Sequence, residues 1–205
     1  MRHVGQEAGK TGRGKGDKSG HQNPFNHSKT ARAAGKFPPA AGPRTESGGM
    51  DFKGMVKEFA AAVEAGDGTR LAGLFSEEGI YHDTFYGEFK GRDAIRMMVE
   101  ERFHRDGERY RWEFRDPVGD GAFGYARWFF SYTSKVAGAE GKRVVFEGFS
   151  CFELEGGEIR HYGEAINVGV GLVQMDFAPA RMDKLFRRWA TELKARPQVA
   201  PHLTG

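Results

Sequence analysis

Apolar residues at helical spacing predict an amphipathic helix at residues 52–65. Its apolar positions are Phe52, Met55, Val56, Phe59 and Val63. This spacing places them on one face of the helix, which is then buried against the rest of a folded domain. Asp51 suits the N-cap, because its side chain accepts backbone hydrogen bonds there, and Gly66 suits the C-terminal end.

Two further helical patterns flank a short apolar strand. The first consists of Leu71, Leu74 and Phe75, and the second of Ile95, Met98, Val99 and Phe103. Thr69 can cap the first of these helices, and Gly79 ends it before a strand at residues 80–85. Gly87 and Gly91 bracket a turn between that strand and the third helix. The first half of the folded part is therefore expected to contain three helices and one strand.

From residue 109 the apolar period changes to two, which is typical of strands. Tyr110, Trp112 and Phe114 alternate with charged residues, so this strand should have one buried and one solvated face. Long strands follow at residues 122–136 and 143–154, and Gly156-Gly157 predicts a hairpin into a last strand, from residue 158 to about 168. Helices followed by a meander predict the α+β class, with helices on one face of a curved antiparallel sheet.

The segment after Pro179 predicts a C-terminal amphipathic helix, because proline is favoured at the first helical position. Its apolar stripe consists of Met182, Leu185, Phe186, Trp189 and Leu193, opposite the basic residues Arg181, Lys184, Arg187, Arg188 and Lys194. We expect this helix to pack on the sheet or across a cavity mouth. Binding to a membrane surface, which basic amphipathic helices also perform, is the alternative.

Charge separates an N-terminal tail from the rest of the chain. Residues 1–49 contain 9 Lys and Arg, 3 Asp and Glu, many glycines and few apolar residues. Such a segment cannot bury enough surface to offset its ordering entropy, so we expect a disordered basic tail at 1–49 and one domain at 50–205. That domain holds 22 basic and 25 acidic residues, which argues against a specific nucleic-acid partner. Because residue 50 is a methionine, translation that starts at Met50 is an alternative to a translated tail.

Composition also bears on the compartment and on metals. Cys151 is the only cysteine, so an internal disulfide is impossible and a cytoplasmic location is expected. No apolar run approaches the ~20 residues that span a bilayer, so no membrane partner is expected. His82, His104 and His161 match no ligand spacing, and we therefore predict no metal site.

Asp83 is the clearest candidate for chemistry. It lies among the apolar and aromatic residues Ile80, Tyr81, Phe85 and Tyr86. A carboxylate among aromatic rings is costly unless it has a partner or a function. Because side chains alternate along a strand, Tyr81 shares the face of Asp83 and His82 points away.

Two interpretations of Asp83 remain open. The functional one is a general acid or base whose pKa is raised by its surroundings. The structural one is a carboxylate that caps a turn or pairs with Arg92 or Arg96. An open pocket with Asp83 unpaired would favour the first, and an ion pair with an arginine the second.

Four short motifs occur in a fixed order along the chain. They are FAAAVEAGD at residues 59–67, LFSEEG at 74–79, GRDAI at 91–95, and GEI at 157–159 ahead of Tyr162 and Glu164. In this order they resemble the SnoaL-like branch of the nuclear transport factor 2-like superfamily. The resemblance implies a cone-shaped curved sheet with three N-terminal helices that enclose a pocket.

The steroid delta-isomerases of that superfamily suggest roles for single positions. Asp83 falls where these enzymes carry their general base. Phe59 and Gly148 fall where they carry the two donors to the oxyanion, a tyrosine hydroxyl and a protonated aspartate. Since oxyanion donors contribute several kcal/mol of barrier lowering, steroid isomerisation itself is not expected.

The resemblance also implies which side chains face the pocket. Tyr162, Glu164 and Ile166 share one face of the last strand, which by analogy points inward. We name Asp83, Tyr162 and Glu164 as catalytic candidates; the substrate-binding candidates are Phe59, Tyr81, Phe85, Phe146, Ser150, Phe152 and Ile166. Two inward carboxylates would titrate as a coupled pair, unless Glu164 pairs with an arginine such as Arg127.

These observations predict a protein that binds a small apolar or aromatic molecule. With Asp83 moving a proton, it would catalyse isomerisation, cyclisation, dehydration or hydration without a cofactor. The alternative is a non-catalytic ligand-binding or dimerisation module of the same fold, because a fold shared by many functions proves none of them.

The strand at residues 122–136 predicts a homodimer. It carries Phe123, Tyr125 and Phe129 on one face and Trp128, Phe130 and Tyr132 on the other. A strand that is apolar on both faces is covered on both, by helices on the inner side and by a partner chain on the outer side.

Overall fold

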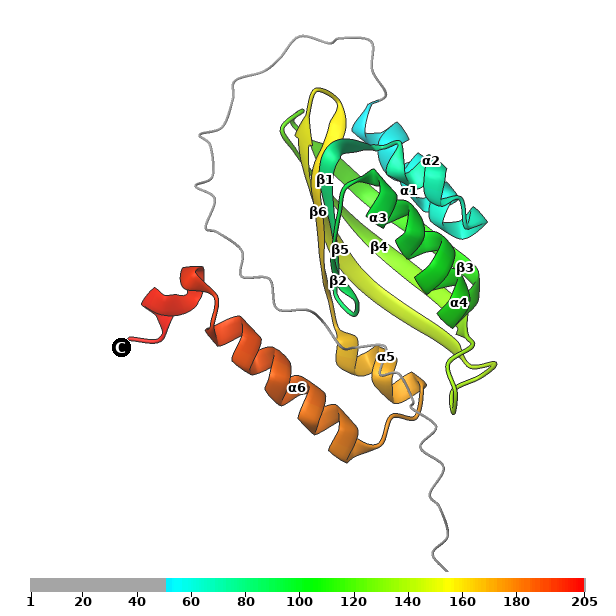
Figure 1. The fold of residues 1–205 in the computed structure, drawn as a ribbon, viewed down its shortest axis with the longest axis vertical. Coiled ribbons are helices and arrows are strands. Elements are labelled where there is room, and N and C mark those ends of the chain that lie inside the picture. Colours follow the sequence, from blue (N-terminus) through cyan, green and yellow to red (C-terminus); the bar gives the residue numbers. More distant parts are fainter. Residues whose placement is uncertain (1–50, 205) are drawn as a thin grey trace, which may run out of the picture.

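The computed structural model describes residues 51–204. The predicted basic tail at 1–49 and the alternative start at Met50 lie outside the described residues. Within them, a curved six-stranded sheet carries a helical layer on one face, and two further helices follow the last strand (Figure 1). This arrangement confirms the predicted α+β class, and the sheet is open rather than closed into a barrel.

The helical layer comprises α1 (Phe52–Ala65), α2 (Gly68–Ala72), α3 (Arg92–Met97), a π-helical segment η1 (Met98–Phe103) and the short α4 (His104–Asp106). Asp51 caps α1 by accepting a 2.7 Å hydrogen bond from the Gly54 amide, and Gly66 ends it with a φ of 70°. Both helix ends are as the sequence predicts. The apolar face of α1 packs against the sheet, chiefly on β3.

The sheet is built from β1 (Phe75–Asp83), β2 (Gly87–Lys90), β3 (Gly107–Gly119), β4 (Phe123–Ser134), β5 (Arg143–Glu155) and β6 (Glu158–Ile166). Its strand order is β2-β1-β6-β5-β4-β3. All neighbouring pairs are antiparallel except β1 and β6, which run parallel. The predicted curved antiparallel sheet therefore contains one parallel pair.

Three local predictions in the N-terminal part also need correction. Phe75 begins β1 instead of ending the short helix, which stops at Ala72. Asp67, not Thr69, caps that helix, by accepting a 2.8 Å hydrogen bond from the Arg70 amide. The expected turn between Gly87 and Gly91 contains β2, which at four residues is too short to show a period and depends on pairing with β1.

Strand β3 bends over the helical layer. Its pairing with β4 shifts register twice, and the shifts coincide with Arg109 at φ 53° and Asp116 at φ 49°. A residue in the left-handed region at a register shift is typical of a β-bulge, which bends a strand and increases its twist. The bends allow the sheet to wrap around Phe59, whose ring lies at the centre of the core, with 0% of its surface exposed.

The C-terminal part differs from the prediction. Strand β6 ends at Ile166, and a further helix, α5 (Val168–Gln174), precedes α6 (Pro179–Lys194) and the 3-10 turn η2 (Pro197–His202). The helix α6 begins at Pro179 as predicted, but it runs away from the sheet and buries only Leu185 (Figure 1). Among the described residues, no helix has the length and apolar character needed to cross a membrane.

Candidate functional site

A cavity of about 80 Å³ lies between the concave face of the sheet and the helices. Eleven of its seventeen lining residues are aromatic: Tyr81, Phe85, Tyr86, Phe103, Tyr110, Trp112, Trp128, Phe130, Tyr132, Phe146 and Phe177. Three carboxylates, on Asp83, Asp106 and Glu164, share the wall with them. Such a space is apolar with a few polar groups, as is usual for small-molecule sites.

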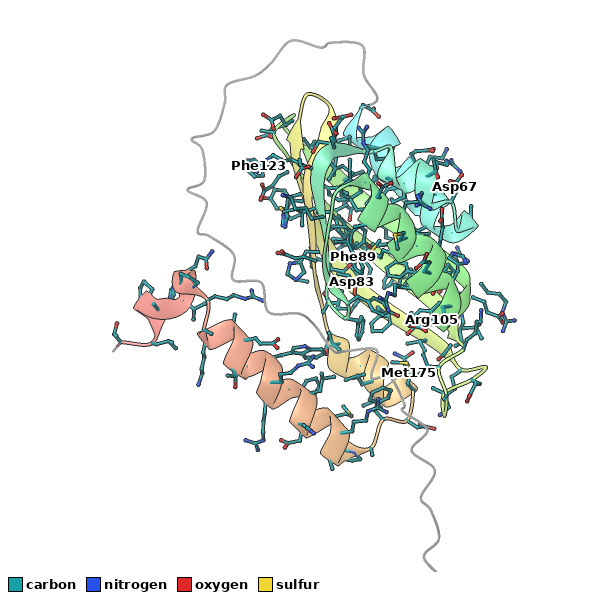
Figure 2. All side chains as sticks on the ribbon, in the orientation of Figure 1. Asp67, Asp83, Phe89, Arg105, Phe123 and Met175 are labelled. Atoms are coloured by element: carbon teal, nitrogen blue, oxygen red, sulfur yellow. The ribbon has the colours of Figure 1, made fainter. Side chains whose placement is uncertain are left out.

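The parallel pairing of β1 with β6 places two of these carboxylates side by side. Tyr81 is the register partner of Tyr162. Two residues further along both strands, and on the same face, come Asp83 and Glu164. In Figure 2 Asp83 lies at the end of the sheet nearest α5 and Met175.

Asp83 ends β1 and starts a tight turn. Its Oδ1 accepts hydrogen bonds of 2.7 Å from the amides of both Phe85 and Tyr86. The residue is 5% exposed, and burial raises the pKa of its carboxyl group to about 6, while the two amide donors favour the charged form and offset part of this effect. The turn therefore holds the carboxylate in one orientation at the cavity wall.

Glu164 is held by two donors. Its Oε1 accepts a 3.2 Å hydrogen bond from the Thr84 amide, and its Oε2 a 3.0 Å hydrogen bond from the Tyr162 hydroxyl. Burial first, and the negative charge of Asp83 second, raise the pKa of Glu164 to about 8. The two carboxyl groups therefore titrate as a coupled pair, in which Glu164 keeps its proton to a higher pH than Asp83.

A chain of hydrogen bonds extends from Glu164 into the core. Trp128 Nε1 donates to Ser150 Oγ at 2.8 Å, and Ser150 Oγ lies 2.8 Å from the Tyr162 hydroxyl. The indole N–H of Trp128 can only donate, whereas either hydroxyl of the Ser150–Tyr162 pair can be the donor. Each of these side chains has a hydrogen-bond partner, so the network holds the Glu164 side chain in place from the core side of the cavity wall.

The arginines that could have paired with these carboxylates are engaged elsewhere. Arg92 donates to the Phe75 carbonyl and to Glu158, at 2.7 Å each. Arg96 pairs with Glu100 at 2.8 Å, and Arg127 with Asp116 at 3.1 Å. Of the two structural forms predicted for Asp83, the turn cap is therefore present, because Asp83 accepts from the amides of Phe85 and Tyr86, and the pair with Arg92 or Arg96 is not. The pair predicted between Glu164 and Arg127 is not formed either.

Asp106 lines the cavity although no sequence pattern predicted a role for it. It accepts a 2.6 Å hydrogen bond from the Tyr86 hydroxyl and a bidentate pair of bonds from Arg105. Although burial opposes it, these donors lower the pKa of Asp106. The residue follows the π-helical segment at the end of the helical layer, where no apolar period indicates direction, so no sequence signal pointed to it.

The structure divides the predicted site residues into two groups. Six of them line the cavity: Tyr81, Asp83, Phe85, Phe146, Glu164 and Ile166. The other four, Phe59, Ser150, Phe152 and Tyr162, lie behind that wall in the packed core. They face inward as predicted, but the rings of Phe59, Tyr81 and Tyr162 stack against each other, with centroids 4.5 to 5.9 Å apart, and fill this end of the cone.

The structure leaves no room for a side chain at Gly148. A Cβ atom there would lie 2.6 Å from Trp128 Cζ2 and 2.7 Å from the Ala165 carbonyl oxygen. Trp128 thus occupies the space that a side chain at this position would need. Position 59, which the resemblance relates to the other donor, carries a phenylalanine without a hydroxyl group.

Replacing Gly148 with alanine should therefore destabilise the fold. We expect the free energy of unfolding to fall by about 1–3 kcal/mol, because a backbone oxygen cannot move aside for the new methyl group. Gly163→Ala on β6 is the matched control, since its Cβ would meet only His161 Cε1 at 3.6 Å. Urea unfolding measures both variants, and equal free energies for the two would contradict this packing.

One cluster with metal-ligating atom types lies outside the cavity. His82, Glu88 and His161 bring such atoms within 4.8 Å of one another. His82 and Glu88 are register partners on β1 and β2, with Nδ1 3.4 Å from Oε1, and His161 Nδ1 lies 3.6 Å from Glu153 Oε1. Cross-strand pairing of histidine with glutamate accounts for this proximity.

Comparison with known proteins supports the fold. A model of the SnoaL-like domain matches residues 56–162, more than half of the chain. No curated protein matches the chain. A solved structure of a hypothetical protein with a ketosteroid isomerase-like fold from Catenulispora acidiphila, in complex with trimethylamine, has a TM-score of 0.54 at 20% identity, over 61% of this chain and 97% of that one.

Two other solved structures are similar over the same part of the chain. TsrD from Streptomyces laurentii has a TM-score of 0.52 at 20% identity, over 60% of this chain and 92% of its own. A putative polyketide cyclase from Pseudomonas putida has a TM-score of 0.51 at 23% identity, over 62% and 98%. At these identities the likeness shows the fold. Together with the domain match, it shows that this chain belongs to the SnoaL-like domain family and has its ketosteroid isomerase-like fold.

Proposed function

We propose that the protein binds a small apolar or aromatic molecule in its cavity and moves a proton on it, with Asp83 as the general base. The observation that carries this proposal is the pair Asp83 and Glu164, two adjacent carboxylates on an aromatic wall with no ion pair to Arg92, Arg96 or Arg127. A raised pKa near the working pH is what efficient proton transfer needs.

The two carboxyl groups suit different roles. Asp83, ionised at neutral pH, can accept a proton from carbon next to a carbonyl group. Glu164, protonated at neutral pH, can return a proton to another atom of the substrate, and Tyr162 holds it in place. Isomerisation, cyclisation, dehydration and hydration can each proceed by removal of a proton from one atom of the substrate and addition of a proton to another. None of these steps requires a cofactor.

Similar proteins support a small-molecule site. The structure from Catenulispora acidiphila contains trimethylamine, and the one from Pseudomonas putida is described as a putative polyketide cyclase. Both share only the fold with this chain, so they support the class of ligand and not its identity.

Hydrogen exchange at carbon tests the proposal directly. The purified full-length protein would be screened by thermal shift against small aromatic ketones, with 1-indanone as the first probe. Exchange of the protons next to the carbonyl would then be followed by NMR in deuterated water. We expect protein-dependent exchange for the ketones that bind. Binding with exchange no faster than in buffer would favour the non-catalytic alternative.

The outer face of the sheet supports a second proposal, homodimerisation. Tyr125 and Phe129 on β4 and Val145 and Phe149 on β5 are all exposed there, Phe149 at 58%. Large apolar side chains exposed together on one sheet face are typical of a contact with another protein, and a sheet face that repeats in a second copy suits a twofold interface.

Phe149→Lys should weaken such a dimer. We expect its dissociation constant to rise at least about tenfold, because a charge would be buried at the centre of the contact. Val173→Lys, equally exposed on α5 at 62%, should leave it unchanged. Analytical ultracentrifugation measures all three proteins, and a monomeric wild type at high concentration would rule the dimer out.

We also propose a cytoplasmic location. Cys151 is the only cysteine of the chain, and in the structure it is a free, partly buried thiol on β5. A protein without disulfides is suited to a reducing compartment. Fractionation of the native cells with antibody detection would test this location.

A further inference from the structure

The charges around the cavity are unbalanced. Among its lining residues, all within the part of the chain that the structure describes, there is no lysine, arginine or histidine. Asp106 is neutralised by Arg105, whose guanidinium bonds both carboxylate oxygens at 2.6 and 2.7 Å. Asp83 and Glu164 receive hydrogen bonds only from backbone amides and a hydroxyl, which are neutral donors. The wall therefore keeps net negative charge that no protein cation offsets.

The remainder of the wall suits the same kind of ligand. Aromatic faces attract a cation within about 6 Å of the ring centroid, by roughly 0.5–2 kcal/mol each. Trp112, Trp128 and Tyr132 line the cavity from β3 and β4. Alkyl groups around a charged nitrogen would also contact these rings without losing hydrogen bonds to water.

Other ligand classes fit less well. A carboxylate or phosphate would be repelled by the Asp83 carboxylate, and the lining offers no cation to hold it. A neutral molecule can fill the apolar space, yet it leaves the buried negative charge as costly as before.

We propose that the ligand of this cavity carries a positively charged nitrogen, a protonated amine or a quaternary ammonium group, on an apolar body. This inference rests on the proposed small-molecule function and names the class of substrate. The charged nitrogen lies beside Asp83 and Glu164, with its alkyl groups against the aromatic rings. It also stabilises negative charge that forms on the substrate when a proton is removed, a task for which positions 59 and 148 supply no donor.

Binding of a cation must then be linked to proton release. The titratable groups that face the pair are Tyr81, Tyr86, Tyr110, Tyr132, Tyr162 and Asp106. Burial raises the pKa of each tyrosine, and the pKa of Asp106 is lowered, so none of them changes charge between about pH 5 and 9. In this pH range, only Asp83 and Glu164 among these groups change their charge. A cation favours its ionised form, so affinity should rise with pH.

Two ligands of the same shape can separate the effect of the ligand's positive charge from the effect of its shape. Choline and 3,3-dimethyl-1-butanol have the same shape and differ by the positive nitrogen. Calorimetric titration of the full-length protein should show choline binding at least about tenfold more tightly than the alcohol at about pH 9. At about pH 5 this preference should shrink, whereas the affinity of the alcohol should stay constant. Titration in two buffers of different ionisation enthalpy should show proton release with choline alone.

Variants locate the effect. In the double variant Asp83→Asn and Glu164→Gln the preference for choline should vanish, while the alcohol still binds. In Glu147→Gln it should persist, because Glu147 is exposed on β5 and is not part of the cavity lining. Equal affinities for choline and the alcohol in the wild type, or no binding of choline, would overturn the inference. The proposed proton transfer is judged separately, by exchange in neutral ketones.

Discussion

Asp83→Asn is expected to slow protein-dependent hydrogen exchange in a bound ketone by about 100-fold or more, the usual contribution of a general base. The reason is chemical rather than structural. Asparagine keeps an oxygen that can accept the 2.7 Å hydrogen bonds from Phe85 and Tyr86, so the turn after β1 and the cavity wall should persist. What is lost is the basic oxygen. The dissociation constant of the ketone should stay within about threefold of the wild type.

Asp106→Asn is the matched control for this experiment. The substitution also replaces a carboxylate of the cavity wall with an amide. Unlike Asp83, however, Asp106 forms an ion pair with Arg105 and accepts a hydrogen bond from Tyr86. We expect it to retain most of the exchange rate. Unchanged exchange in Asp83→Asn, or equal losses in both variants, would show that Asp83 is not the base.

Glu164→Gln should make the protein more stable in alkaline solution. The pKa of Glu164 is about 8 in the fold against 4.5 for a free side chain, so between these pH values the folded state binds more protons than the unfolded state. The wild-type free energy of unfolding must then fall as pH rises through this window. Glutamine carries no charge, so the variant should gain on the order of 5 kcal/mol over the wild type at about pH 9 and nothing at about pH 4.

The same experiment needs a glutamate that does not lie in the cavity. Glu147, exposed on the outer face of β5, provides it, and Glu147→Gln should follow the wild type at every pH. Urea unfolding from about pH 4 to 9 measures all three proteins. If Glu164→Gln keeps the wild-type slope, then Glu164 is ionised throughout and cannot supply a proton.

Local pattern was sufficient for most of the elements. The helical spacing around Phe59, its cap at Asp51 and its stop at Gly66 each arise from interactions within a few residues, so they could be predicted and are confirmed. The alternation in β3 to β6 likewise reflects one buried face. Errors occurred at β2 and α5, which have four and seven residues. Elements this short are stabilised by contacts with β1 and β5 and leave almost no period in the sequence.

The candidate site shows the same division. Strand parity by itself determined that Asp83 and Tyr81 share one face, and that Tyr162 and Glu164 share another, because side chains alternate whatever the strand is paired with. Strand parity does not determine how far apart the carboxylates of Asp83 and Glu164 lie. With Tyr81 opposite Tyr162, an antiparallel pair would set Asp83 opposite Arg160 and give it a cation. Only the parallel pairing of β1 with β6, in which Tyr81 pairs with Tyr162, 81 residues further along the chain, sets Asp83 beside Glu164 and leaves both carboxylates without a cation.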